Sequence, residues 1–258
     1  MFSLDGQAAF VTGAGQGLGA AIALGLAQAG AGVMLTDVDA AAAEAVAAGL
    51  RDAGHRCIAM ALDVRDESAF ERSFEAAVQH FGAIDLMVNN AALTPSTSLW
   101  DITAGEWDEV MAVNLRGSFF GCRIAGRHMR ERGEGRIVNL GSMAGIWSYP
   151  SGSSYVASKF AVHGYTRALR DDLQGKPVRV TNVAPGLVET NFSKVRFKGD
   201  EDKASAVYSD VAMGGPMHAE DVADCIMFAL TRPPHVNVDE IVVMALAQIS
   251  GANILRES

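Results

Sequence analysis

The sequence predicts an α/β fold built on a doubly wound, mostly seven-stranded parallel sheet with helices on both faces, in three layers. Apolar runs typical of buried strands alternate with longer helical segments from one end of the chain to the other. These runs are continuous rather than alternating, which favours parallel strands covered on both faces. The chain contains no evident linker or internal repeat, so we expect one domain over residues 1–258.

The expected elements alternate regularly along the chain, and the residues that follow strands are the site candidates, because ligands of such sheets bind beyond the carboxyl ends of the strands. Strands are expected at Ala8–Thr12, Gly32–Thr36, Arg56–Met60, Ile84–Val88, Arg136–Leu140, Val178–Val183 and Glu240–Met244. Helices are expected at Gly17–Ala29, Ala40–Ala53, Glu67–Phe81, Ala104–Arg132, Ser153–Leu173 and Ala219–Leu230. Alanine and leucine favour the first two helices by propensity. The segment Val188–Asp210 is expected to be irregular, with short helices at most.

The composition narrows the classes of partner and location. The 258 residues carry a net charge of −9, which argues against nucleic-acid binding because that requires a basic surface. Cys57, Cys122 and Cys225 have neither metal-ligand nor disulfide spacing, so we expect no metal and a reducing, cytoplasmic setting. The apolar stretch Ala20–Leu35 is too short and interrupted to span a bilayer, and we see no signal peptide. We therefore expect a small-molecule partner.

A glycine-rich turn, Thr12–Gly19, follows the first strand and opens the first helix. Its pattern is T-G-x-x-x-G-x-G rather than G-x-G-x-x-G. Glycines at such a turn let the backbone approach a pyrophosphate bound at the helix N-terminus. The candidate cofactor residues of the turn are Gly13, Gln16, Gly17, Leu18 and Gly19. The alternative is a turn that only packs a helix against the sheet.

Asp37, at the end of the second strand, predicts a preference for NAD over NADP. Its carboxylate could accept hydrogen bonds from the adenosine ribose and would repel a 2′-phosphate. No Arg or Lys lies between Gly13 and Arg51 to neutralise that phosphate. The alternative is that Asp37 is a turn or capping residue, a role that Asp39 could also fill.

Two further strand ends carry cofactor candidates. Asp63 and Val64 follow the third strand, where the carboxylate could accept from the adenine amino group or cap the next helix. Asn90 and Ala91 follow the fourth strand, where polar amides also tie strand ends together.

Tyr155 and Lys159 are four residues apart in an expected helix, so they share one face. Tyrosine loses its proton near pH 10, and acid–base work near neutrality requires nearby positive charge. Lys159 and an oxidised nicotinamide would supply two such charges, so we expect a lowered pKa of Tyr155. Ser142 follows the fifth strand, where its hydroxyl could hold a substrate oxygen on which negative charge develops.

In order and spacing, these motifs resemble those of the short-chain dehydrogenase/reductase family, which has a Rossmann fold. The shared motifs are T-G-x-x-x-G-x-G, Asn89-Asn90-Ala91, Val113-Asn114, Gly141-Ser142, Y-x-x-x-K and Pro185-Gly186. The resemblance implies an alcohol dehydrogenase or carbonyl reductase in which Tyr155 is the acid/base, Lys159 binds the nicotinamide ribose and Ser142 orients the substrate. It also implies that Asn114 holds a water for proton relay. The nicotinamide end would be lined by Pro185, Gly186, Val188 and Thr190.

The carboxyl-terminal half is similar to the 3-hydroxy-acid dehydrogenase branch of that family, whose members act on serine, allo-threonine and 3-hydroxypropionate, the reduced form of malonic semialdehyde. The matching segments are Trp147–Pro150, Leu173–Gly175, Pro185–Thr190, Phe192–Asp200 and His235–Val238. The chain departs from the branch at Asp37, where basic residues for NADP are usual. Ala92 replaces a common glycine, and Met244–Gln248 lacks an expected proline.

A small carboxylate substrate needs a cationic partner, and the expected substrate loop, about residues 187–215, contains Arg196 and Lys198. Arg196 could bind a carboxylate bidentately, although both residues could instead be solvated loop charges. Trp147 and Tyr149 could line the pocket or pack beneath the loop.

We therefore expect hydride transfer between NAD(H) and a small secondary alcohol or carbonyl compound, with a 3-hydroxy acid as the first candidate. A general ketone, sugar or steroid dehydrogenase is the alternative within the enzyme class. A methyltransferase would have no use for Tyr155, Lys159 and Ser142 as a set, and a non-catalytic dinucleotide sensor typically loses the tyrosine or the lysine. Family members pair the helix that contains the tyrosine, so the resemblance implies a homo-oligomer, a dimer or tetramer.

Overall fold

Residues 3–197 and 199–257 are described by the computed structural model of the protein. Lys198, one of the expected substrate residues, lies outside the described residues. Among the described residues, no helix has the length and apolar character needed to cross a bilayer.

Seven parallel strands form one sheet in the order β3-β2-β1-β4-β5-β6-β7, which confirms the expected doubly wound fold. The strands are β1 (Ala8–Thr12), β2 (Gly32–Asp37), β3 (Cys57–Ala61), β4 (Leu86–Asn89), β5 (Gly135–Leu140), β6 (Val178–Pro185) and β7 (Glu240–Val243). The strand order reverses between β1 and β4, which pair from Ala9 with Leu86 to Val11 with Val88. A crevice for ligands is expected at the carboxyl ends of these two strands.

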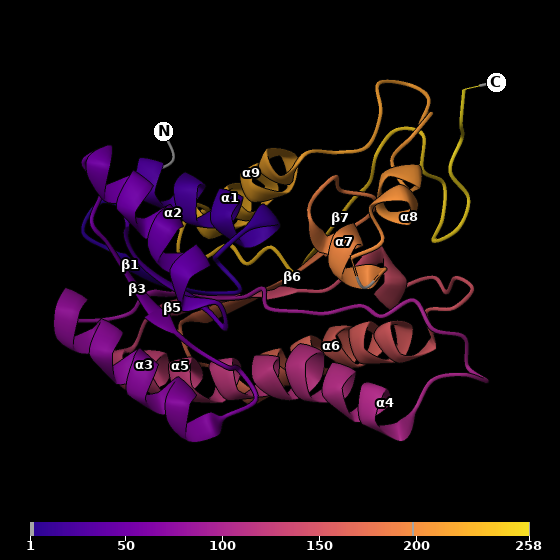
Figure 1. The fold of residues 1–258 in the computed structure, drawn as a ribbon. Coiled ribbons are helices and arrows are strands. Elements are labelled where there is room, and N and C mark those ends of the chain that lie inside the picture. The colour runs from indigo at the N-terminus through magenta and orange to yellow at the C-terminus, as the bar shows by residue number, and fades with distance from the viewer. Residues whose placement is uncertain (1–2, 198, 258) are drawn as a thin grey trace.

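Helices cover both faces of the sheet, and Figure 1 shows the two layers they form. One layer contains α1 (Gly17–Gln28), α2 (Ala40–Asp52) and α9 (Ala219–Leu230). The other contains α3 (Glu67–Phe81), α4 (Ala104–Met111), α5 (Ser118–Arg132) and α6 (Ser153–Asp172). Two short helices, α7 (Phe192–Arg196) and α8 (Glu201–Ala206), lie in the segment that we expected to be irregular.

The hydrophobic core is divided by the sheet into two halves. Successive residues of a strand point to opposite faces, so Ala9 and Val11 of β1 join the half beneath α1 and α9, whereas Phe10 joins the half beneath α3 and α5. Phe10 stacks on Phe70 of α3, with ring centroids 5.6 Å apart. Burial on both faces explains why the strands are continuous apolar runs.

The expected helix over Ala104–Arg132 is continuous but contains a π-helical segment at Ala112–Gly117, between α4 and α5. Such segments are rare and occur often at functional sites. Asn114, an expected catalytic residue, lies in this segment. Its last residue, Gly117, passes close to Val64: a Cβ there would lie 2.8 Å from a Val64 methyl carbon. The π-helical segment therefore packs directly against the end of the third strand.

Candidate active site

The carboxyl ends of the strands, the glycine-rich turn and the segment after β6 enclose a cavity of about 960 Å³. All the cofactor residues expected from the sequence border it, as do Ser142, Tyr155, Lys159, Tyr149 and Arg196. Of the expected residues that the structure describes, Asn114 and Trp147 lie outside the lining. No group of three or more His, Cys, Asp or Glu side chains among the described residues is placed to hold a metal ion.

The glycine-rich turn forms a cradle that fits a dinucleotide pyrophosphate. A Cβ on Gly19 would overlap the carbonyl oxygen of Gly13, and a Cβ on Gly13 would lie 2.9 Å from the Cα of Ala91. Both positions therefore exclude a side chain. Among the described residues, the side chain of Gln16 at the N-cap makes no capping bond to α1, and a helix N-terminus of this kind suits an anion.

The sequence did not decide which of Asp37 and Asp39 caps the next helix and which faces the cofactor cavity; in the structure the two residues have different contacts. The Asp39 side chain caps α2 by accepting from the backbone N–H groups of Ala41 and Ala42. The Asp37 carboxylate borders the cavity and accepts from the N–H of Gly15 at 3.0 Å. Asp37 thus anchors the glycine-rich turn and also presents a carboxylate to the site.

Asp63 borders the cavity, and its carboxylate is already paired with Arg65. Both its carboxylate oxygens accept from the guanidinium of Arg65, at distances from 2.7 to 3.0 Å, and this hydrogen bonding lowers the pKa of Asp63. Arg65 also pairs with Glu109 at 3.5 Å and borders the cavity. The sequence analysis missed Arg65, although it follows the third strand directly after Asp63 and Val64.

Asn90 ties the ends of β1 and β4 together, as the sequence suggested for such amides. Its side-chain amide donates to the carbonyl oxygens of Thr12, at 2.9 Å, and Gly13, at 3.0 Å. The Thr12 hydroxyl oxygen accepts from the N–H groups of Asn90 and Ala91. The strand ends are therefore held at the spacing that the cradle requires.

Tyr155 and Lys159 are buried on one face of α6, beside the turn that contains Ser142. The Lys159 Nζ donates to the carbonyl oxygen of Leu140 at 2.6 Å and lies 5.6 Å from the centre of the Tyr155 ring. The Ser142 Oγ accepts from the N–H of Ala144 at 3.1 Å and donates weakly to the carbonyl oxygen of Pro185 at 3.5 Å. The three expected side chains are thus brought together.

The pKa of Tyr155 departs from the expectation in direction. Burial, followed by repulsion from Tyr149, raises the pKa of Tyr155, whereas a hydrogen bond with Ser142 and the charge of Arg196 oppose the rise. Burial also lowers the pKa of Lys159 to about 8. Burial therefore disfavours the charged form of each group, although Lys159 remains mostly protonated at neutral pH.

Both polar atoms of the Asn114 side chain are hydrogen-bonded, and they join the segment at Leu93 to α6. Its Oδ1 accepts from the N–H of Leu93 at 2.8 Å, while its Nδ2 donates to the Leu93 carbonyl at 2.9 Å and to the Ser158 hydroxyl at 3.0 Å. Ser158 in turn donates to the carbonyl oxygen of Tyr155 at 2.7 Å. A relay water would have to bind the backbone carbonyl of Asn114, which already accepts from Ser118.

Arg196 reaches the cavity from α7, and its guanidinium lies over the ring of Tyr149 at 5.1 Å. Its Nε is buried without a hydrogen-bond partner among the described residues. Thr94, which the sequence analysis missed, also borders the cavity with a buried hydroxyl that has no such partner. The N–H of Ser96 donates to the Arg196 carbonyl at 3.2 Å, so the two segments are joined.

Trp147 does not line the cavity, so one of our two expectations for it is wrong. The 3-10 turn at Met143–Gly145 carries it to the surface, where 40% of the residue is exposed. Gln248, which we did not single out, borders the cavity instead. Its Oε1 accepts from the N–H of Leu187 at 2.6 Å, and its Nε2 contacts the Met143 sulfur at 2.7 Å. Polar contacts thus shape this rim without the expected proline.

Comparisons with known proteins agree over most of the chain. The sequence model of the family described as short chain dehydrogenase matches residues 7–201. The chain is 42% identical over 190 residues to sulfoacetaldehyde reductase 2 of Chromohalobacter salexigens, across 72% of this chain and 74% of that protein. It is 37% identical over 199 residues to the NADP-dependent 3-hydroxy acid dehydrogenase YdfG of Shigella flexneri, across 76% of this chain and 79% of that protein. The solved closed form of serine dehydrogenase complexed with NADP+ has a TM-score of 0.89 and 33% identity, across 97% of this chain and 100% of that one.

Proposed function

The chain belongs to the short-chain dehydrogenase/reductase family, and we propose that it transfers a hydride between NAD(H) and a small alcohol or carbonyl compound that carries an anionic group. The proposal depends above all on one observation. Tyr155 and Arg196 border the same cavity, and Arg196 lies near enough for its charge to lower the pKa of the tyrosine. A molecule with its oxygen at Tyr155 and its anion at Arg196 would be small.

Tyr155 carries the proton transfer in this reaction, and a nicotinamide, when bound, supplies the hydride donor or acceptor. During oxidation the Tyr155 phenolate removes the proton of the substrate hydroxyl; during reduction the phenol returns a proton to the carbonyl oxygen. The Ser142 hydroxyl donates to the same oxygen. The ammonium group of Lys159 stabilises the phenolate, and Asn114 fixes α6 through Ser158.

Arg196 and Thr94 form the proposed anion subsite. Both have a buried polar atom without a partner among the described residues, and such atoms are costly unless a ligand satisfies them. A guanidinium matches the oxygens of a carboxylate or a sulfonate. In 3-hydroxypropionate, in serine and in the alcohol formed from sulfoacetaldehyde, one carbon separates the carbinol carbon from the anionic group. We therefore propose 3-hydroxy acids first and short hydroxysulfonates second, with residues 187–215 as the substrate loop.

Asp37 supports NAD as the preferred cofactor. A carboxylate beside the adenosine ribose would repel a 2′-phosphate. Arg65, a cationic residue that borders the same cavity, is already paired with Asp63. The names of two of the proteins compared above, the dehydrogenase YdfG and the serine dehydrogenase complex, carry NADP. Our proposal follows the residue at position 37 of this chain rather than those names.

We also propose a homo-oligomer, a dimer or tetramer, that works in the cytoplasm. Phe160 of α6 is 47% exposed, and Gly164 and Ala168 continue the same exposed stripe, which offers a close-packing surface to a second copy. All three cysteines are unpaired, as suits a reducing compartment.

Nicotinamide absorbance of the purified protein tests the proposal. NAD and NADP would each be supplied with 3-hydroxypropionate, L-serine, allo-threonine, 3-hydroxybutyrate, 2-hydroxyethanesulfonate and neutral secondary alcohols. We expect the highest kcat/KM with NAD and an anionic substrate. Turnover confined to neutral alcohols would leave the family assignment intact and reject the anion subsite.

Two variants, which remove the guanidinium and the threonine hydroxyl in turn, make that test more specific. Arg196→Gln should raise KM for the anionic substrate by about tenfold or more, since a charged hydrogen bond contributes roughly 1.5–3 kcal/mol. Thr94→Val should raise it severalfold. Neither should change KM for a neutral alcohol. An unchanged KM for the anionic substrate in Arg196→Gln would reject Arg196 as its partner.

A further inference from the structure

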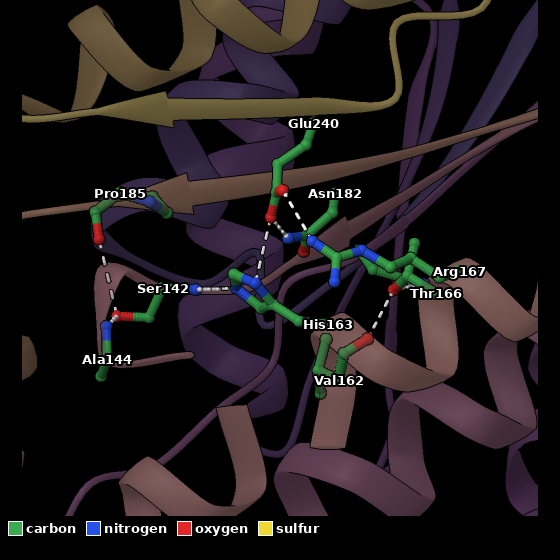
Figure 2. Close-up of polar contacts among 10 residues, drawn as sticks. Ser142, Ala144, Val162, His163, Thr166, Arg167, Asn182, Pro185 and Glu240 are labelled. Atoms are coloured by element: carbon green, nitrogen blue, oxygen red, sulfur yellow. Dashed lines mark hydrogen bonds and ion pairs between the residues drawn. The ribbon is translucent and has the colours of Figure 1, made fainter. Parts of the chain in front are cut away.

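A polar network centred on the buried His163 lies behind the Ser142 turn, and His163 itself is not part of the cavity lining (Figure 2). The backbone N–H of Ser142 donates to the Nε2 of His163 at 3.4 Å, and the Nδ1 of His163 lies 3.0 Å from the Oε1 of Glu240. Glu240, at the start of β7, also accepts from the Asn182 amide at 2.7 Å and pairs with Arg167 at 3.2 Å. We call these contacts the His163 network.

The contacts of His163 favour a neutral imidazole. Burial lowers its pKa, and among the charged groups around it Glu240 raises the pKa whereas Lys159 and Arg167 lower it. A neutral imidazole whose Nδ1–H donates to Glu240 leaves Nε2 as an acceptor for the Ser142 N–H. An imidazolium has no acceptor and could not make that second contact.

The Ser142 turn is shaped around the imidazole ring. A Cβ on Gly141 would lie 2.5 Å from the His163 Nε2, and a Cβ on Gly145 would lie 2.5 Å from the His163 Cδ2. Glycine at these two positions, on either side of Ser142, therefore makes room for the ring. Such close packing leaves the turn little freedom to shift relative to α6.

We propose that His163 is a positioning residue for the reaction, which holds the backbone at Ser142 so that the serine hydroxyl stays aligned with Tyr155. Tyr155, Lys159, His163 and Arg167 follow one another at four-residue intervals along α6, so one helix face presents the acid/base and also fixes its partner serine. Glu240 orients the imidazole from β7. The inference rests on the proposed role of Ser142.

Three substitutions separate the two hydrogen bonds of His163. In His163→Gln the side-chain carbonyl can still accept from the Ser142 N–H, whereas the shorter amide of His163→Asn reaches only towards Glu240. His163→Leu removes both contacts. Because a misplacement of about 1 Å can cost roughly a hundredfold in rate, we expect kcat to fall tenfold to a hundredfold in His163→Leu and His163→Asn. His163→Gln should retain most of the activity, and NAD affinity should stay within about twofold in all three.

His128 supplies a matched control. It also accepts a backbone N–H through Nε2, from Ile84 at 3.3 Å, and burial also lowers its pKa, but it packs against Phe74 beside the amino-terminal end of β4. We expect His128→Gln and His128→Leu to affect thermal stability without changing kcat in the folded protein.

A double-mutant cycle with Ser142→Ala decides whether His163 acts through Ser142. The residual kcat of Ser142→Ala should change less than about twofold when His163→Leu or His163→Asn is added. An equal loss in both backgrounds, or full kcat in a folded His163→Leu or His163→Asn, would overturn the proposal. If His163→Leu does not fold, the contrast between the Asn and Gln variants carries the same test. Failure of the proposed function itself would appear differently, as no turnover of any substrate by the unaltered protein.

Discussion

At the residue scale, burial of Tyr155 and Lys159 determines the direction in which the pKa of each group shifts. Burial moves the pKa of each group towards its neutral form, upwards for the phenol and downwards to about 8 for the amine. Lys159 is still mostly protonated at neutral pH, and the carbonyl oxygen of Leu140 accepts a hydrogen bond from its ammonium group. A nicotinamide cation beside the pair would favour the phenolate, so acid–base competence would follow cofactor binding.

Replacing Tyr155 with phenylalanine should remove turnover but not cofactor binding. The change deletes only a hydroxyl, and general acid–base catalysis typically contributes about 10²–10⁴-fold, so kcat should fall at least a hundredfold. Because the glycine-rich cradle is untouched, the Kd for NAD measured by fluorescence titration should stay within about twofold. Near-normal turnover in Tyr155→Phe would refute the assignment of the acid/base.

Lys159 should make stability depend on pH in a defined direction. Its pKa falls from 10.5 to about 8 on folding, so the unfolded chain binds more protons between these values and stability rises with pH there. Between pH 7 and pH 10.5 the free energy of unfolding of the unaltered protein should gain roughly 3 kcal/mol relative to Lys159→Met. Urea unfolding of both proteins at the two pH values measures the difference. A constant difference would contradict the buried charge.

At the scale of the elements, most of the fold could be predicted because each local signal agreed with its neighbours. The strands lie within two residues of the expected bounds, since continuous apolar runs fit only strands buried on both faces. The π-helical segment around Asn114 could not be foreseen, because its pattern is that of an ordinary helix. The close approach of Gly117 to Val64 is a tertiary contact that this pattern likewise does not encode.

Two aspartates at the junction of β2 and α2 allow the proposed cofactor selection to be tested separately from helix capping. Asp37→Ser should raise the ratio of kcat/KM for NADP over NAD by about tenfold or more, because repulsion of a 2′-phosphate at close range amounts to about 1–4 kcal/mol. Asp39→Ala removes the cap of α2 and should lower the free energy of unfolding by about 1 kcal/mol with the cofactor ratio unchanged. Coenzyme kinetics and urea unfolding of both variants provide the comparison. Equal cofactor ratios in the two would show that Asp37 does not select.

At the scale of the whole molecule, the doubly wound topology brings residues that are far apart in sequence together at the carboxyl ends of the strands. The rule led us to Ser142, which follows β5, whereas Asn114 lies inside a helical region and was expected from the family resemblance alone. The position of the strand ends could not predict which of these side chains pair with each other or turn to the surface. Arg65 binds the carboxylate of Asp63, and the turn after Ser142 carries Trp147 to the surface. Thr94 and Gln248 reach the cavity through loop conformations that no sequence period encodes.

The exposed stripe of α6 leads to a prediction about assembly that one pair of variants can test. A Cβ on Gly164 would meet nothing within 4 Å in the single chain, and the same holds for Gly49 of α2. Arginine at either position is therefore compatible with the folded subunit. If α6 packs closely against a second copy, Gly164→Arg should split the oligomer, whereas Gly49→Arg should leave its mass unchanged. Light scattering after gel filtration measures both. A Gly164→Arg variant with the mass of the parent would exclude this face as the interface, and a monomeric parent would exclude the oligomer itself.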